Sequence, residues 1–125
     1  MRYSLLLHHV EATPEDVGGE EWAEAQAAFA AYLQALDDAG VLIAAEILQP
    51  TASSTTFTLK DGSPQVQDGP FADSKEQLGG FFLLEVPDLD AALAWAEKCP
   101  AAQWGTIEIR PTAVHGQAGQ WVAPS

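Results

Sequence analysis

The stretch from Gln67 to Gly80, QDGPFADSKEQLGG, sets a carboxylate beside residues that restrict the backbone. Asp68 and Gly69 form a turn sequence, because glycine tolerates positive φ and aspartate can bond its own backbone two residues on. Pro70 fixes φ, and Phe71 is expected to anchor the loop onto the core. The stretch is therefore either a structural turn between two strands or an acid–base site whose carboxylate is positioned in advance.

His8 and His9 are the histidines that could act as a base beside Asp68. Strand alternation places their side chains on opposite faces, so only one of them can face a shared cleft. Either could instead be a solvated or hydrogen-bonded side chain. Together with His115 and the scattered carboxylates they show no metal-ligand spacing, so neither a metal nor another cofactor is predicted.

Arg110, Lys75 and Glu76 are the other charged candidates. Arg110 could bind a substrate carboxylate through two parallel hydrogen bonds, or form an ion pair with Asp68 or Glu76. Lys75 and Glu76 could pair with each other or with Arg110 to hold the loop. The candidate catalytic residues are Asp68, His9 and His8, and the candidate substrate-binding residues are Arg110, Phe71, Lys75 and Glu76.

Two helices are expected to support these residues. Over residues 22–40, apolar side chains recur at three- and four-residue steps in an alanine-rich background, which predicts an amphipathic helix that Gly40 ends in a left-handed conformation. A second helix is predicted over 89–99, with Asp88 as N-cap and Pro100 as its stop. The acidic, turn-rich connection at 11–21 could be mobile.

Strand patterns occupy much of the remaining chain, at residues 2–9, 41–49, 54–60, 64–67, 79–86 and 105–111. Asp61 and Gly62 are a strong hairpin signal between the third and fourth of these. The fifth, GGFFLLEV, is apolar on both faces, as a central strand would be.

The resulting order is β-α-β, a hairpin, then β-α-β, which predicts a ferredoxin-like α+β fold with an antiparallel sheet and both helices on one face. The other face is expected to carry Phe57 or its neighbours together with one face of FFLLEV. Because monomers rarely leave such an apolar patch exposed, we expect a homodimer that pairs through its sheets.

Length and charge limit the other possibilities. The 125 residues are expected to form one domain with its core at about 1–111, and a tail at 112–125 that packs loosely or against a partner. A single cysteine, Cys99, excludes an internal disulfide. A formal charge of −13 disfavours nucleic acid and anionic membranes as partners, and no segment is long and apolar enough to span a bilayer. A cytoplasmic protein is expected.

The segments DGPFADSKEQLGGFFLLEV, DLDAALAWAEKCP and GTIEIRP, with YSLLLHH and AGVLIAAEILQP before them, resemble the DGPF-motif branch of the YCII-related domain family. The resemblance extends to Arg110 and implies a ferredoxin-like fold and dimers of the α+β-barrel kind. Members are mostly uncharacterised, and some lie beside or are fused to extracytoplasmic-function sigma factors. A few relatives in the wider superfamily are isomerases, dehydrochlorinases or oxygenases that act on small cyclic molecules.

The resemblance also implies a histidine from the first helix region that works with the loop aspartate in the enzyme-like relatives. This chain matches the aspartate as Asp68 but has no histidine between His9 and His115. Two hypotheses follow: a small-molecule enzyme or binder that uses Asp68 as its acid or base, and a non-enzymatic regulatory module that contacts a sigma factor or another regulatory protein.

Overall fold

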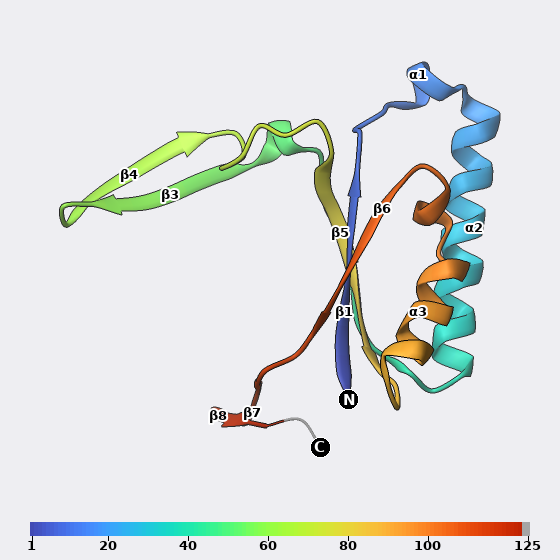
Figure 1. Cartoon of the computed structure of the whole chain (residues 1–125). Helices are drawn as coiled ribbons and strands as arrows, with labels where there is room; N and C mark the ends of the chain where they lie inside the picture. The colour runs from blue at the N-terminus through green and yellow to red at the C-terminus, as the bar shows by residue number, and fades with distance from the viewer. Residues whose placement is uncertain (124–125) are drawn as a thin grey trace.

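A four-stranded antiparallel sheet forms the centre of the protein in the computed structural model, which describes residues 1–123. Its strands, in spatial order, are β2 (Leu42–Ile47), β5 (Gln77–Glu85), β1 (Arg2–His9) and β6 (Gly105–Pro111). Helices α2 (Gly19–Asp38) and α3 (Leu89–Lys98) both cover one face, and the opposite face is open (Figure 1). The predicted ferredoxin-like α+β fold is confirmed.

The core lies between the sheet and the two helices. On β1, Tyr3, Leu5 and Leu7 are buried, while the residues between them are only partly covered, as the period of two requires. The central strand β5 contributes Phe82 and Leu84 to the same core.

Helix α2 begins three residues earlier than the sequence pattern predicted and is followed by Gly40 at φ 72°, the expected left-handed residue. The preceding connection is more ordered than expected. It contains the short helix α1 (Pro14–Val17), which a capping box between Thr13 and Asp16 begins.

Helix α3 begins where predicted, since the Asp88 carboxylate accepts a hydrogen bond from the Ala91 backbone N–H. The chain then makes a 3₁₀ turn at Pro100–Gln103. Tyr32 of α2 donates a 2.8 Å hydrogen bond to the Trp95 carbonyl of α3, which ties the helices together. Burial raises the pKa of both the Tyr32 hydroxyl and the Cys99 thiol above their usual ranges.

The predicted hairpin is present but does not join the main sheet. Strands β3 (Thr55–Lys60) and β4 (Ser63–Asp68) follow a 3₁₀ turn at Thr51–Ser53 and pair only with each other. They form an arm that projects from the body on the side of the open face (Figure 1). The expectation that Phe57 lies on the open face was therefore wrong, because its strand leaves the sheet.

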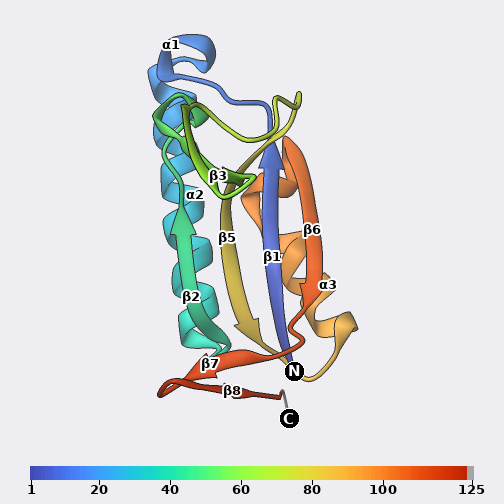
Figure 2. The same ribbon diagram turned by 90° about the vertical axis from the view of Figure 1, so that its left-hand side faces the viewer.

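The tail also differs from expectation. Within residues 112–123 it forms a second small hairpin, β7 (His115–Gln117) and β8 (Gln120–Val122), around Ala118 and Gly119 at positive φ. This hairpin crosses one end of the sheet, as seen onto the open face in Figure 2. The last two positions of the expected tail, 124–125, lie outside the described residues. No helix within residues 1–123 is long and apolar enough to cross a membrane.

Candidate functional site

The open face of the sheet has an apolar centre flanked by charged groups. Leu6 of β1 lies opposite Phe81 of β5 and Glu108 of β6, and directly opposed residues share a face. Glu46 of β2 is opposite Phe81, so a carboxylate lies on each side of the Leu6–Phe81 pair. Leu6 and Phe81 are only half-buried, because no element within residues 1–123 covers this face.

A hydrogen-bonded network lies at one side of this centre. Glu108 accepts from both neighbours: its Oε1 is 3.1 Å from His8 Nε2, and its Oε2 is 3.1 Å from Arg110 Nε. His8 is the most covered of the three, with 29% of its side chain exposed, against 45% for Glu108 and 69% for Arg110. The register of β1 and β6 creates the cluster, since it aligns His8 and Ser4 with Thr106 and Arg110.

This geometry suits proton transfer. When His8 donates from Nε2 to Glu108, the neutral ring keeps Nδ1 as an acceptor that can remove a proton. Arg110 uses Nε for Glu108, and its two Nη groups make no hydrogen bond within residues 1–123, so they can bind an anionic oxygen. The carboxylate thus orients a base and an anion-binding group together.

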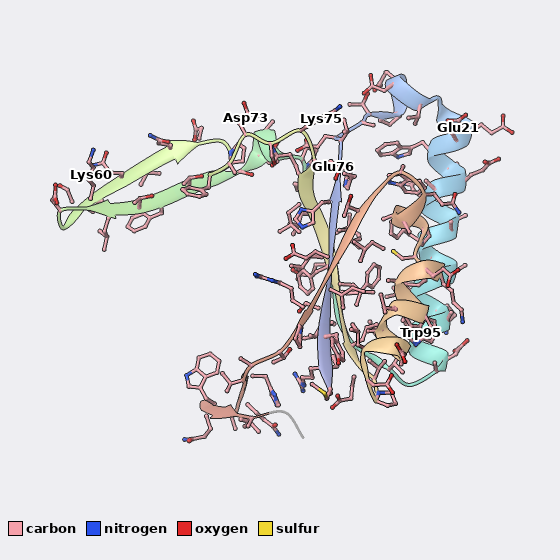
Figure 3. All side chains as sticks on the ribbon, in the orientation of Figure 1. Glu21, Lys60, Asp73, Lys75, Glu76 and Trp95 are labelled. Carbon is pink, nitrogen blue, oxygen red and sulfur yellow. The ribbon has the colours of Figure 1, made fainter. Side chains whose placement is uncertain are left out.

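Glu76 is the loop residue that reaches this face. Thr106, which lies opposite His8, donates a 3.0 Å hydrogen bond from Oγ1 to Glu76 Oε1. Figure 3 shows Glu76 where the loop enters β5. The expected pairing of Glu76 with Lys75 or Arg110 was wrong, since neither pair lies within salt-bridge distance in residues 1–123.

Asp68 occupies the base of the arm rather than the open face. It ends β4 opposite Thr55, and its carboxylate is exposed without a hydrogen bond in the described part of the chain. The adjacent Gly69, at φ 104°, donates to the Ser54 carbonyl at 2.8 Å and accepts from Thr56 Oγ1 at 2.7 Å. These two hydrogen bonds hold the Gly69 turn against the start of β3, so the turn has a structural role.

No hydrogen bond or salt bridge joins Asp68 to His8 or Arg110 within residues 1–123. Arg110 is opposite Ser4, four residues along β6 from the Thr106 that contacts the loop, which is about 13 Å of strand. Its ion-pair partner is Glu108, not Asp68 or Glu76 as expected.

Phe71 does not anchor its loop as predicted, because its side chain is 89% exposed. Lys75 is exposed as well and makes no ion pair within residues 1–123. The loop is held instead by Gln77, whose amide donates to the carbonyls of Ala72 and Ser74 at 3.2 and 2.9 Å.

His9 does not join the network. Its Nδ1 is 3.1 Å from the Val10 carbonyl, and its ring lies where a Cβ on Gly79 would stand. Gly79 and Gly80 thus allow close packing: a Cβ on Gly80 would come within 2.6 Å of the Glu46 carbonyl oxygen of β2. Their role is steric.

Glu108 is the residue of the network that the sequence patterns did not mark as a candidate. The alternation of GTIEIRP predicts that Glu108 and Arg110 share one face, but only the pairing of β6 with β1 brings His8 to Glu108. Among residues 1–123, no group of three or more histidine, cysteine or acidic side chains is arranged to hold a metal ion.

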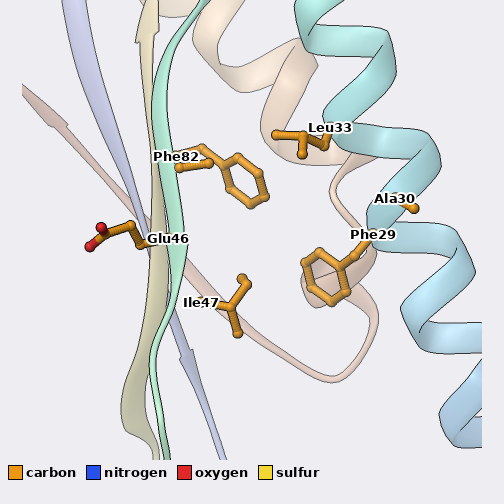
Figure 4. Close-up of a pocket in the computed structure, with 7 residues that line it drawn as sticks. Phe29, Ala30, Leu33, Glu46, Ile47 and Phe82 are labelled. Atoms are coloured by element: carbon orange, nitrogen blue, oxygen red, sulfur yellow. The ribbon is translucent and has the colours of Figure 1, made fainter.

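Two grooves lie at the edges of the sheet, and neither contains the network. One, of about 210 Å³, separates α2 from β2 and is lined by Phe29, Leu33, Ile47 and Phe82 (Figure 4). The Glu46 carboxylate at its border points away from this groove, toward the open face (Figure 4). The other, of about 430 Å³, is a shallow depression between α3 and β6. Acid–base chemistry is therefore supported on the open face rather than in either groove.

Comparison with a solved structure agrees with this architecture. The fold is similar to that of 5-chloro-2-hydroxyhydroquinone dehydrochlorinase from Burkholderia phenoliruptrix AC1100, determined as a complex with 2,5-dihydroxybenzoquinone. The match covers 90% of this chain and 93% of that one at a TM-score of 0.50, and 16% of residues are identical. At this identity the likeness shows the fold alone.

Sequence comparison is more specific. An uncharacterised protein of Rhizobium meliloti (strain 1021) is 33% identical over 117 residues, which cover 92% of this chain and 94% of the relative. The model of the YCII-related domain matches residues 1–114, from β1 to the end of the main sheet. The chain belongs to the YCII-related domain family.

Proposed function

We propose that this protein is a small-molecule enzyme or binder that acts on a small cyclic organic substrate at the open face of the sheet. The observation that carries the proposal is the network of His8, Glu108 and Arg110 beside the apolar surface of Leu6 and Phe81. Apolar surface with a few convergent polar groups is typical of small-molecule sites.

The proposed chemistry is proton transfer within a ring. His8 Nδ1 removes a proton from a carbon next to a carbonyl, which leaves an enolate, and Arg110 stabilises the enolate oxygen. In a ring with a C=C bond next to that carbon the enolate is a dienolate, and return of the same proton to the far carbon of the former C=C bond shifts the double bond into conjugation with the carbonyl. The product is an isomer of the substrate, so atoms and electrons balance without a further reactant. The ligand bound to the structurally similar dehydrochlorinase, 2,5-dihydroxybenzoquinone, is also a small ring with carbonyl oxygens.

Asp68 remains a second candidate acid or base in this proposal. Its loop continues to Gln77, which pairs with His9 at the end of the sheet where His8 also lies. The DGPF segment that contains Asp68 also supports membership of the branch of the family that carries this motif.

The proposal includes a homodimer in which two open faces pack together. Leu6, Phe81 and Leu83 are partly exposed on this face, and a second sheet would remove them from water and enclose the network. Light scattering is expected to give twice the mass of one chain, and a monomer at all concentrations would contradict the dimer.

A thermal-shift screen against small cyclic acids, phenols and lactones tests the site. A ligand at 100 times its dissociation constant stabilises the folded protein by about 2.7 kcal/mol. We expect His8→Asn and Arg110→Gln to abolish that stabilisation, and the matched variant His9→Asn to keep it. Asp68→Asn then decides whether Asp68 takes part. A ligand that still stabilises both His8→Asn and Arg110→Gln would contradict a site at this network.

A second candidate function is that of a regulatory module for an extracytoplasmic-function sigma factor. The exposed apolar side chains of the arm favour it, because such surface marks contacts between proteins. It predicts that no compound in the screen stabilises the protein, and that a purified sigma factor binds it in a salt-sensitive manner.

A further inference from the structure

The arm formed by β3 and β4 lacks a packing partner within residues 1–123. Its two strands pair with each other in one register from Thr55↔Asp68 to Lys60↔Ser63, around the positive-φ turn at Asp61 and Gly62. An isolated two-stranded hairpin is at best marginally stable in water. An arm of this kind needs a surface to pack against.

The arm has one apolar and one polar face. Phe57 is opposite Val66, and Leu59 is opposite Pro64, so these four side chains share a face, which we call the apolar stripe. Phe57, Leu59 and Val66 are 61% to 65% exposed. The other face carries the opposed pairs Thr56↔Gln67 and Thr58↔Gln65.

We propose that the apolar stripe packs against a second copy of this chain and closes one end of the space between two paired sheets. The inference rests on the sheet-to-sheet dimer proposed above. Six residues of strand reach about 20 Å, whereas packed sheets are about 10 Å apart. An arm that projects on the open side is therefore long enough to extend past the partner's sheet and contact the edge of the partner chain.

The position of the two hairpins favours a second copy as the occupant. The arm and the β7–β8 hairpin both project on the open side of the sheet, from its opposite ends, so the open face lies between them (Figures 1 and 2). Trp121 on the second hairpin is 78% exposed. In a two-fold dimer the arm and the β7–β8 hairpin of each copy lie on either side of the partner's sheet.

Charge favours the same occupant. Two copies of a chain with a net charge of −13 repel each other, so surface with few carboxylates favours a further contact between them. The apolar stripe is such a surface. The two carboxylates of the arm lie at its ends: Asp61 in the turn at the tip, beside Lys60 (Figure 3), and Asp68 at the base of the face that carries the stripe. A basic protein partner would instead be attracted to the acidic surface elsewhere.

The first test is the dissociation constant of the dimer, measured by sedimentation over a dilution series. The double variant Phe57→Thr/Val66→Thr removes the centre of the stripe and places a β-branched threonine, which favours strands, at both positions. We expect its dissociation constant to rise at least tenfold. The matched double variant Thr58→Ser/Gln65→Thr, an opposed pair on the polar face, should leave the constant unchanged.

The second test is cross-linking from the tip of the arm. Ser63 is exposed, whereas the native Cys99 is buried, so Ser63→Cys accepts a thiol-reactive photo-cross-linker selectively. Dimers mixed from ¹⁴N- and ¹⁵N-labelled chains should give cross-linked peptides that join the two isotopes. Cross-links confined to one chain would overturn the inference.

The outcomes separate the two proposals. A wild type that is monomeric, or that forms complexes only with a sigma factor, overturns both the dimer and the role of the arm. A wild-type dimer whose dissociation constant is unchanged in Phe57→Thr/Val66→Thr overturns the arm contact alone and leaves the paired sheets standing.

Discussion

The two faces of the sheet are built by the same strands, yet only one of them is complete in a single chain. Along β1, Leu5 and Leu7 on the helix side are at most 2% exposed, while Leu6 and His8 on the other side stay partly exposed. The centre of the covered face packs against apolar side chains of α2 and α3. The open face instead holds a polar network and half-buried apolar groups, which suits binding and assembly rather than folding.

The sharpest test of this contrast compares two adjacent leucines. Leu5→Ala removes a fully buried side chain and is expected to lower the free energy of unfolding by about 3 kcal/mol, because a cavity remains in the core. Leu6→Ala is expected to cost less than about 1 kcal/mol in dilute protein, since Leu6 is already partly in water. Urea denaturation measures both values. Equal losses would show that the open face contributes as much to folding as the covered one.

A second prediction compares the stability lost when each of the neighbouring glycines Gly79 and Gly80 is replaced by alanine. Gly80→Ala is expected to destabilise the protein by about 2 kcal/mol, because its Cβ would meet the main chain of Glu46, which cannot rotate away. Gly79→Ala should cost less, since the obstacle is the mobile ring of His9. Thermal unfolding of the two variants checks the order, and a reversed order would contradict this account.

A third prediction concerns the bond that joins the two helices on the covered face. Tyr32→Phe removes the donor to the Trp95 carbonyl and is expected to cost about 1 kcal/mol at neutral pH. Unfolding in urea at pH 7 measures it. An unchanged midpoint would show that water replaces the hydroxyl.

Two buried groups on the covered face, Cys99 and Tyr32, are expected to lower the free energy of unfolding at alkaline pH. Burial raises the pKa of Cys99 and Tyr32, so the unfolded chain releases their protons first, from about pH 8.5 for the thiol and about pH 10 for the phenol. The native state then binds more protons than the unfolded state, and stability falls as pH rises. Tyr32→Phe should show a shallower decline above about pH 10 than the wild type. Parallel declines would contradict the assignment to Tyr32.

The smallest effect on stability is expected on the open face. Glu108→Gln breaks the partly exposed ion pair with Arg110 and alters the hydrogen bond with His8, which together contribute about 1 kcal/mol or less. The same variant should weaken ligand binding strongly, because His8 and Arg110 lose the group that orients them. Urea denaturation and the thermal-shift screen measure the two effects. A large loss of stability with unchanged binding would make the network structural.

Local sequence patterns predicted most of the fold. The expected strands and helices all exist with ends shifted by a few residues, and Asp88, Gly40 and the Asp61–Gly62 turn act as expected. These features depend on side chains and backbone within one or two turns of chain. The direction of the arm was not predicted, because nothing local states whether a hairpin joins a sheet or leaves it.

The candidate site was predicted only in part. The chemistry of His8, Arg110 and Glu76 makes them candidates from the sequence. His8 and Arg110 lie on the open face of β1 and β6, and Glu76 contacts Thr106 of β6 from the loop. The rigid turn predicted at Asp68 and Phe71 is present, but the carboxylate and the ring are both exposed. A rigid turn determines local backbone geometry and does not determine what the turn faces.

The sequence by itself determined the order and type of the elements, since alternation, helical periodicity, caps and turn residues act over short distances. Only the tertiary structure decided which side chains meet. His8 and Glu108 are separated by 100 positions and contact each other through the register of β1 with β6. That register is set by burying Leu5, Leu7, Ile107 and Ile109 under the helices, so the packing of the covered face assembles the network on the open one.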